Sequence, residues 1–239
     1  MDEAGKVNHH WQEFIEEVPW VLANGKVLEV GESSPVGAWA PFSPEFEQLF
    51  PELDLVLRKA CVTSIVLDGA KYQLFSWVDR DGISCSWLSP EASVDPPVSV
   101  FAEHRVLLTS FGGIVERSHE PDWWLADHND ALTELVARKD ATFLKDWDSE
   151  PSVFEGTPIP IEMEQFYVIA EEVNANCTLC HRLTGEIVLF AHDHLFDHVK
   201  RYPGCPENTL YRLPTARHFR DWVNAIAFQW RTSIDAIRF

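Results

Sequence analysis

The sequence predicts an α+β protein in which a central antiparallel or mixed sheet is flanked by helices. Pairs of apolar runs with hairpin signals alternate irregularly with segments of helical period, unlike the regular strand–helix alternation of a parallel α/β fold. Hydrophobic residues make up 46% of the 239 positions and aromatic residues 12%, which is enough apolar material for a packed core. The length suits one large domain, or one domain with an N-terminal elaboration.

Two amphipathic segments predict helices near the N-terminus. In the first, apolar residues recur at the spacing of one helical face after a candidate N-cap, Asn8. That face consists of Trp11, Phe14, Ile15 and Val18. The second segment begins with Ser43 and Pro44, a cap followed by a first-turn proline, and we expect Pro51 to kink or split it.

A β-rich stretch follows, with strand-like runs at 61–67, 71–78 and 83–88 separated by hairpin signals. In the third run, apolar residues alternate with serines, which predicts a half-buried strand. The proline-rich loop after it is the predicted boundary between an N-terminal α+β extension, residues 1–97, and a main domain, residues 98–239.

The second half of the chain predicts two short helices, further strands and a C-terminal helix. The first helix, at about 99–111, is expected to end at Gly112 or Gly113. The second covers residues 128–140. The expected strands are residues 166–171, 177–183, 186–190 and 209–213. The C-terminal helix, 215–230, has Thr215 as a candidate cap and one apolar face, formed by Phe219, Trp222, Val223, Ile226 and Trp230.

The stretch NCTLCH has the Cys-x-x-Cys-His spacing of c-type haem attachment. On the predicted strand, however, Cys177 and Cys180 point to opposite faces and cannot chelate one ion. The nearby HDHLFDH, which contains His192, His194 and His198, leaves a metal-dependent hydrolase open as an alternative, although its histidines are only local. We predict no catalytic residue, no cofactor and no metal.

The formal net charge is −19, from 19 Lys+Arg against 38 Asp+Glu. Such a surface repels nucleic acid and anionic lipid and favours a basic protein partner, although an acidic surface also serves solubility alone. The acids are concentrated in the first two-thirds of the chain, since residues 1–54 hold eleven acids and two bases and residues 118–172 hold fourteen acids and three bases. Residues 180–239, by contrast, hold six acids and eight bases. The acidic, polar N-terminus lacks the pattern of a signal peptide, so the expected location is cytoplasmic.

Two adjacent tryptophans lie in the acidic segment EPDWWLADHN. We predict that one of them is an exposed anchor of a binding face in residues 118–157, because tryptophan is a favoured contact residue. The predicted face comprises Asp122, Trp123, Trp124, Asp127, Asp130 and Glu155. The alternative is that both tryptophans fill a groove between loop and sheet.

Several pieces occur in an order that is similar to a known family. They are LLTSFGGI at 107–114, HNDAL at 128–132, FYVIAEEVNANCTLCHRLTGEIVLFAHDH at 166–194, YPGCPENTLYRL at 202–213 and FRDWVNAIAFQW at 219–230. Together they resemble the SUKH superfamily, which includes yeast cell-wall-synthesis regulators and many bacterial immunity proteins. The resemblance covers roughly residues 98–232, and residues 1–97 lie outside it.

The resemblance implies a sheet flanked by helices and a function in protein binding, without catalytic residues. It also implies that Gly112 and Gly113 end a helix, that Gly185 forms a hairpin turn, and that Trp222 is a core residue of a helix. The expected function is that of a cytoplasmic bacterial immunity protein that neutralises a toxin, such as a basic nuclease. A SUKH-like regulatory module without a toxin partner is the alternative.

Overall fold

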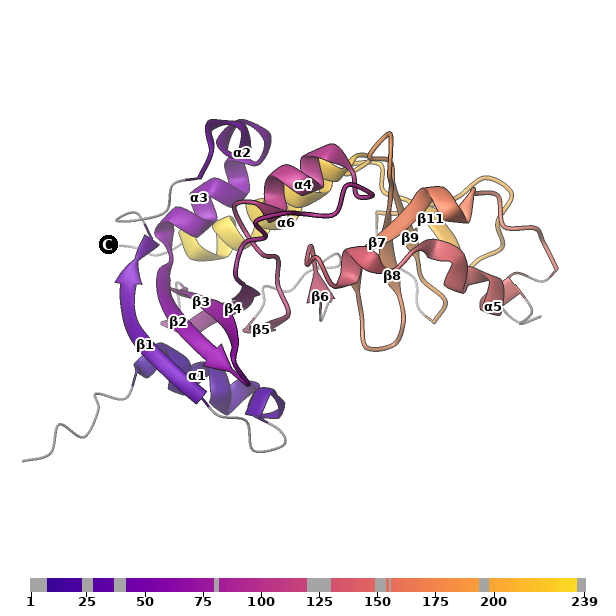
Figure 1. Cartoon of the computed structure of the whole chain (residues 1–239). Helices are drawn as coiled ribbons and strands as arrows, with labels where there is room; N and C mark the ends of the chain where they lie inside the picture. Colours follow the sequence, from indigo (N-terminus) through magenta and orange to yellow (C-terminus); the bar gives the residue numbers. More distant parts are fainter. Residues whose placement is uncertain are drawn as a thin grey trace, which may run out of the picture.

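The computed structural model describes residues 8–22, 28–36, 42–79, 82–119, 130–148, 154, 156–193 and 198–235. In these ranges the chain forms two antiparallel sheets and six α-helices, which confirms the predicted α+β class. The strand orders are β1-β2-β3-β4-β5 and β10-β11-β9-β8-β7-β6. The two sheets lie toward opposite ends of the molecule, and helices α4 and α6 extend between them (Figure 1).

The first sheet is built mainly from the predicted hairpins. Its strands are β1 (Leu28–Pro35), β2 (Cys61–Leu67), β3 (Ala70–Val78), β4 (Ser84–Pro90) and β5 (Glu116–Ser118). Helix α1 (His9–Glu17) covers one face, and α2 (Pro44–Leu49) and α3 (Pro51–Lys59) lie on the other (Figure 1). The Asn8 side chain caps α1 by accepting a hydrogen bond from the Trp11 amide, and Pro51 begins a new helix, both as predicted.

The prediction that the third strand is half-buried is wrong, because helices cover both faces of the first sheet. Trp87 packs in the cluster formed with α3 and α6, whereas Leu88 packs in the cluster formed with α1. The serines of β4 are therefore buried. One of them, Ser86, donates a hydrogen bond to the Ser76 hydroxyl at 2.9 Å. This pairing offsets the cost of burying two hydroxyl groups.

The helix predicted at 99–111 is shorter, because α4 runs from Ala102 to Leu108. Gly112 and Gly113 therefore do not end it. They allow two close backbone approaches instead. A Cβ atom on Gly112 would lie 2.0 Å from the Pro90 carbonyl oxygen, and one on Gly113 would lie 2.6 Å from the Leu132 carbonyl carbon.

The helix predicted at 128–140 is also wrong. The described part of this segment forms a short strand, β6 (Asp130–Ala131), and a 3-10 turn, η3 (Val136–Arg138). The Thr133 hydroxyl donates to Asp130 Oδ1 at 2.6 Å and accepts from the Val136 amide at 3.1 Å. These side-chain bonds compete with a helix, and Leu132 has a φ of +63°, which a helix does not allow.

The second sheet contains the strands predicted in the second half of the chain. These are β7 (Phe166–Glu171), β8 (Cys177–His181), β9 (Ile187–Phe190) and β11 (Leu210–Arg212). The sheet also contains two short strands that were not predicted, β6 and β10 (Lys200–Arg201). Gly185, at a φ of +72°, makes the predicted hairpin turn between β8 and β9. Cys177 and Cys180 belong to different hydrophobic clusters, so they point to opposite faces as predicted.

The C-terminal helix α6 (Phe219–Asp235) begins after the predicted cap, Thr215. The preceding residues pair with the β8–β9 hairpin instead, because the Ile187 amide donates to the Arg217 carbonyl and the Phe219 amide donates to the Gly185 carbonyl, both at 2.8 Å. Trp222 is fully buried, as predicted. No helix in the described ranges is long and apolar enough to cross a membrane.

Three tryptophans join the two ends of the sequence in one core. Trp77 of β3 and Trp87 of β4 lie 4.9 Å apart between ring centroids, and Trp230 of α6 lies 4.9 Å from Trp87. The Trp77 indole donates to the Val56 carbonyl of α3 at 2.9 Å. Residues on both sides of the boundary predicted after position 97 therefore share one hydrophobic cluster, and the division into two domains stays a prediction.

Candidate functional site

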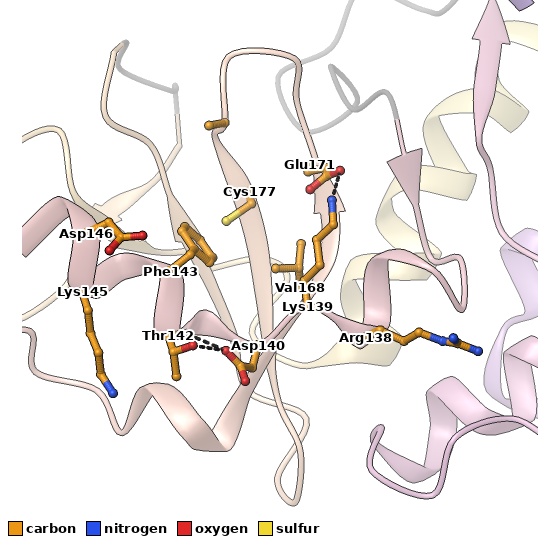
Figure 2. A pocket seen from close by; sticks show the side chains of 11 residues that line it. Arg138, Lys139, Asp140, Thr142, Phe143, Lys145, Asp146, Val168, Glu171 and Cys177 are labelled. Carbon is orange, nitrogen blue, oxygen red and sulfur yellow. Dashed lines mark hydrogen bonds and ion pairs between the residues drawn. The ribbon is translucent and has the colours of Figure 1, made fainter.

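A pocket of 790 Å³ lies over β7 and β8, in part within the predicted binding region, residues 118–157 (Figure 2). The remaining walls come from η3, the 3-10 turn η4 (Ala141–Phe143) and α5 (Leu144–Asp148). Its lining residues are Arg138, Lys139, Asp140, Thr142, Phe143, Lys145, Asp146, Val168, Glu171, Ala175 and Cys177. The polar groups of this lining decide what the pocket can bind.

The basic side chains of this pocket are neutralised by neighbouring carboxylates. Figure 2 shows Lys139 directed at Glu171, with which it forms an ion pair. The other two pairs are Arg138 with Glu134 at 2.7 Å and Lys145 with Glu164 at 2.8 Å. Because each cation already has an anionic partner, the pocket offers little attraction to an anionic substrate.

The pocket thiol is poorly suited to nucleophilic chemistry. Burial raises the pKa of the Cys177 thiol far above its ordinary value, so the reactive thiolate is scarce at neutral pH. Burial also raises the pKa of the Cys180 thiol, to about 12. Both cysteines of the Cys-x-x-Cys stretch are thus small buried side chains with the chemistry of a core residue.

The candidate hydrolase ligands are only partly described. His192 Nε2 lies 2.7 Å from the Asn174 carbonyl oxygen, and the His192 ring packs on Trp147 at 4.3 Å between centroids. His194 lies outside the described residues. Among the residues that are described, no group of three or more His, Cys, Asp or Glu side chains is placed to hold a metal ion.

Of the six predicted binding residues, only Asp130 is described. Asp122, Trp123, Trp124, Asp127 and Glu155 lie outside the described residues. Asp130 is directly opposite Glu171 in the β6–β7 pair, so it lies beside the pocket. Burial, and to a lesser extent the charge of Glu171, raises the pKa of Asp130 to about 6.

A second surface, which the sequence did not predict, surrounds an exposed tryptophan after α1. The 3-10 turn η1 (Pro19–Leu22) presents Trp20 with 59% of its surface exposed. The Trp20 indole N–H donates to Glu116 Oε2 of β5 at 2.7 Å, which fixes the ring orientation against the edge of the first sheet. In the sequence, the position of Pro19 and Trp20 directly after an amphipathic helix is a weak signal for this exposed turn.

Helix α1 supplies further carboxylates beside Trp20. Its apolar face packs on the first sheet, so Glu13, Glu16 and Glu17 lie on the solvent side. We call the surface formed by these three residues, Trp20 and Glu116 the α1–β5 surface. Two of its carboxylates pair with histidines, Glu13 with His9 at 3.1 Å and Glu17 with His119 at 3.5 Å.

One contact of the α1–β5 surface involves the residue that precedes the predicted tryptophan segment in the sequence. His119, which pairs with Glu17, is the last described residue before position 130. Residues 120–129, which include Trp123 and Trp124, follow it in the sequence and lie outside the described residues. An exposed aromatic ring among carboxylates can bind a basic protein surface through both apolar contact and charge.

Comparisons with protein-family models, curated proteins and solved structures found no match to this chain.

Proposed function

We propose that this chain is a bacterial immunity-type protein of the cytoplasm that binds and neutralises a basic toxin, such as a nuclease. The observation that carries the proposal is the α1–β5 surface, where the exposed Trp20 donates to Glu116 and two further carboxylates pair with histidines. The resemblance of residues 98–232 to the SUKH superfamily supports the same function.

The charge of the two partners explains how such binding works. A nuclease needs a cationic surface to hold phosphate groups. An inhibitor with a net charge of −19 is attracted to that surface from a distance, and its carboxylates can cover the phosphate-binding groups. Trp20 then supplies a rigid apolar contact at the centre of a charged rim, which is the usual arrangement of a strong interface.

The pocket chemistry supports a binding protein over an enzyme. The cations of the 790 Å³ pocket are paired with carboxylates, and its thiol is held protonated by burial. A binding protein of this kind requires a folded acidic surface and no reactive group. The segment 120–129 remains part of the proposed binding face, since it continues from His119.

The proposal is tested by capturing the partner from native lysate at low salt and measuring both toxin inhibition and binding kinetics. The variants are Glu16→Lys with Glu17→Lys, and separately Trp20→Ala. The matched control is Glu207→Lys, which is also exposed but lies in the loop before β11. We expect the double reversal to lower the association rate about tenfold at low salt and less at high salt. Trp20→Ala should raise the dissociation rate by about tenfold or more.

The outcomes test separately whether the α1–β5 surface binds the partner and whether binding neutralises a toxin. Equal kinetics for the double reversal and Glu207→Lys would show that the α1–β5 surface is not the binding face. In that case, charge reversal at Asp122 and Asp127 tests the adjoining segment. Capture of a partner whose activity is unaffected by binding would instead favour a regulatory module over an immunity protein.

A further inference from the structure

A second pocket, of 530 Å³, lies between the β9–β11 part of the second sheet and the start of α6. Its lining residues are Thr184, Glu186, Ile187, Lys200, Arg201, Pro203, Arg212, Leu213, Pro214, Arg217 and His218. Four of them are Lys or Arg and one is an acid, in a chain with twice as many acids as bases. This cationic pocket therefore has the opposite charge to the protein as a whole.

The basic groups of the cationic pocket are much less neutralised than those of the pocket over β7 and β8. Arg212 has a distant carboxylate, since its Nε lies 3.9 Å from Glu186 Oε1. Its guanidinium also packs over the Tyr202 ring, with Cζ 4.5 Å from the ring centroid, which holds it in place. Within the described part of the chain, Lys200, Arg201 and Arg217 form no ion pair.

Strand pairing places two of these cations where they repel each other. Lys200 of β10 is directly opposite Arg212 of β11 in the antiparallel register. Like charges at directly opposite positions destabilise a strand pair. A local conflict of this kind is typical of functional sites, where a ligand supplies the missing compensation. An anion between the two side chains would replace the repulsion with two charge-assisted contacts.

The shape and lining of the pocket indicate the kind of anion. A volume of 530 Å³ is in the range of small-molecule sites and exceeds what a single inorganic phosphate needs. Four cations lining one pocket suit several negative charges close together, as in a diphosphate. Two prolines of the lining that are at least partly exposed, Pro203 and Pro214, offer apolar surface to an organic group. The overall charge of −19 disfavours a long nucleic acid strand.

We propose that the cationic pocket binds a compact phosphate anion with several charges, such as a diphosphate or a nucleotide. This inference does not depend on the proposed toxin binding, because the α1–β5 surface contributes no residue to the pocket. The site is a binding site, and no reaction is assigned to it.

Calorimetric titration of the full chain with inorganic pyrophosphate tests the proposal. Salt at about 0.15 M screens long-range electrostatic interactions, so the titration reports binding through contacts at close range. The test variant is Lys200→Gln with Arg217→Gln. The matched control is Arg220→Gln, an exposed arginine in the first turn of α6 that does not line the pocket. We expect wild type and control to bind equally and the double variant to bind at least about tenfold more weakly. ADP binding more tightly than pyrophosphate would show that the organic group contributes.

Thermal unfolding adds a readout that a purely structural role would not produce. Lys200→Gln should slightly raise the melting temperature without anion, because it removes the repulsion with Arg212. Pyrophosphate at about one hundred times its Kd should raise the wild-type melting temperature by about 5–10 °C and shift this variant less. The proposal is overturned if wild type shows neither heat nor shift, or if Arg220→Gln loses as much affinity as the double variant.

Discussion

The carboxyl group of Asp130 makes the stability of the fold depend on pH in a way that can be calculated. Burial raises its pKa from 3.8 to about 6. Between these values the folded state retains a proton that the unfolded chain has released, so stability falls as pH rises through this window. The gap of about two pH units corresponds to about 3 kcal/mol, at 1.36 kcal/mol per unit. That cost is complete above pH 6 and absent below pH 3.8.

Asp130→Asn removes the charge and keeps an oxygen that can accept the Thr133 hydroxyl hydrogen bond. The unfolding free energy of the variant minus that of wild type should rise by about 2–3 kcal/mol when the pH is raised from 4 to 7.5. The assay is urea unfolding of both proteins at each pH. Taking the difference between variant and wild type at the same pH cancels the other carboxyl groups, provided that the two proteins have equal denaturant slopes.

Asp140→Asn is the control with the opposite sign. Hydrogen bonds from the Thr142 side chain and amide lower the pKa of Asp140, so its charge stabilises the fold above the unfolded pKa, and this stabilisation is lost as pH falls. Its asparagine variant should therefore lose nearly as much stability at pH 4 as at pH 7.5, and the loss should shrink only as the pH falls below 3.8. A difference for Asp130→Asn that is independent of pH, or that follows the sign of Asp140→Asn, would refute the account of the buried charge.

Two core substitutions test the packing. Gly112→Ala should lower the unfolding free energy by about 2 kcal/mol or more, because the new Cβ would lie 2.0 Å from the Pro90 carbonyl oxygen. Gly31→Ala, whose nearest neighbour would be a carbonyl oxygen at 3.3 Å, should cost less than about 1 kcal/mol in the same urea assay, and equal costs would contradict the clash. Trp230→Ala should cost about 3–5 kcal/mol and reduce the near-ultraviolet circular dichroism, because the ring is 2% exposed. Phe228→Ala, in the same helix but 47% exposed, should cost less than about 1 kcal/mol; a comparable loss would show that Trp230 has no special place in the core.

Elements with local signals were predicted well. The cap at Asn8, the helix break at Pro51 and the turn at Gly185 each depend on the backbone preference of one or two residues. Strands β2, β3 and β7 match runs of apolar residues bounded by turn signals. Such preferences act within a few residues and are therefore visible in the sequence.

Elements whose form depends on distant partners were predicted poorly. The start of α6 is decided by pairing of residues 217–219 with the β8–β9 hairpin. The alternation in β4 suggested that one face of the strand is exposed. In the structure, α1 packs on that face. Periodicity describes which side chains share a face and says nothing of what packs on it.

For the candidate sites, the sequence by itself determined the excess of carboxylates, the basic C-terminal region and the opposite faces of Cys177 and Cys180. These follow from composition and from the two-residue period of a strand. Only the tertiary structure decided that Trp20 lies against Glu116, 96 positions away, and that Lys200 faces Arg212. The reason is that sheet register and helix docking, which depend on how the whole core packs, bring these side chains together. The backbone preferences of neighbouring residues do not determine which distant side chains meet.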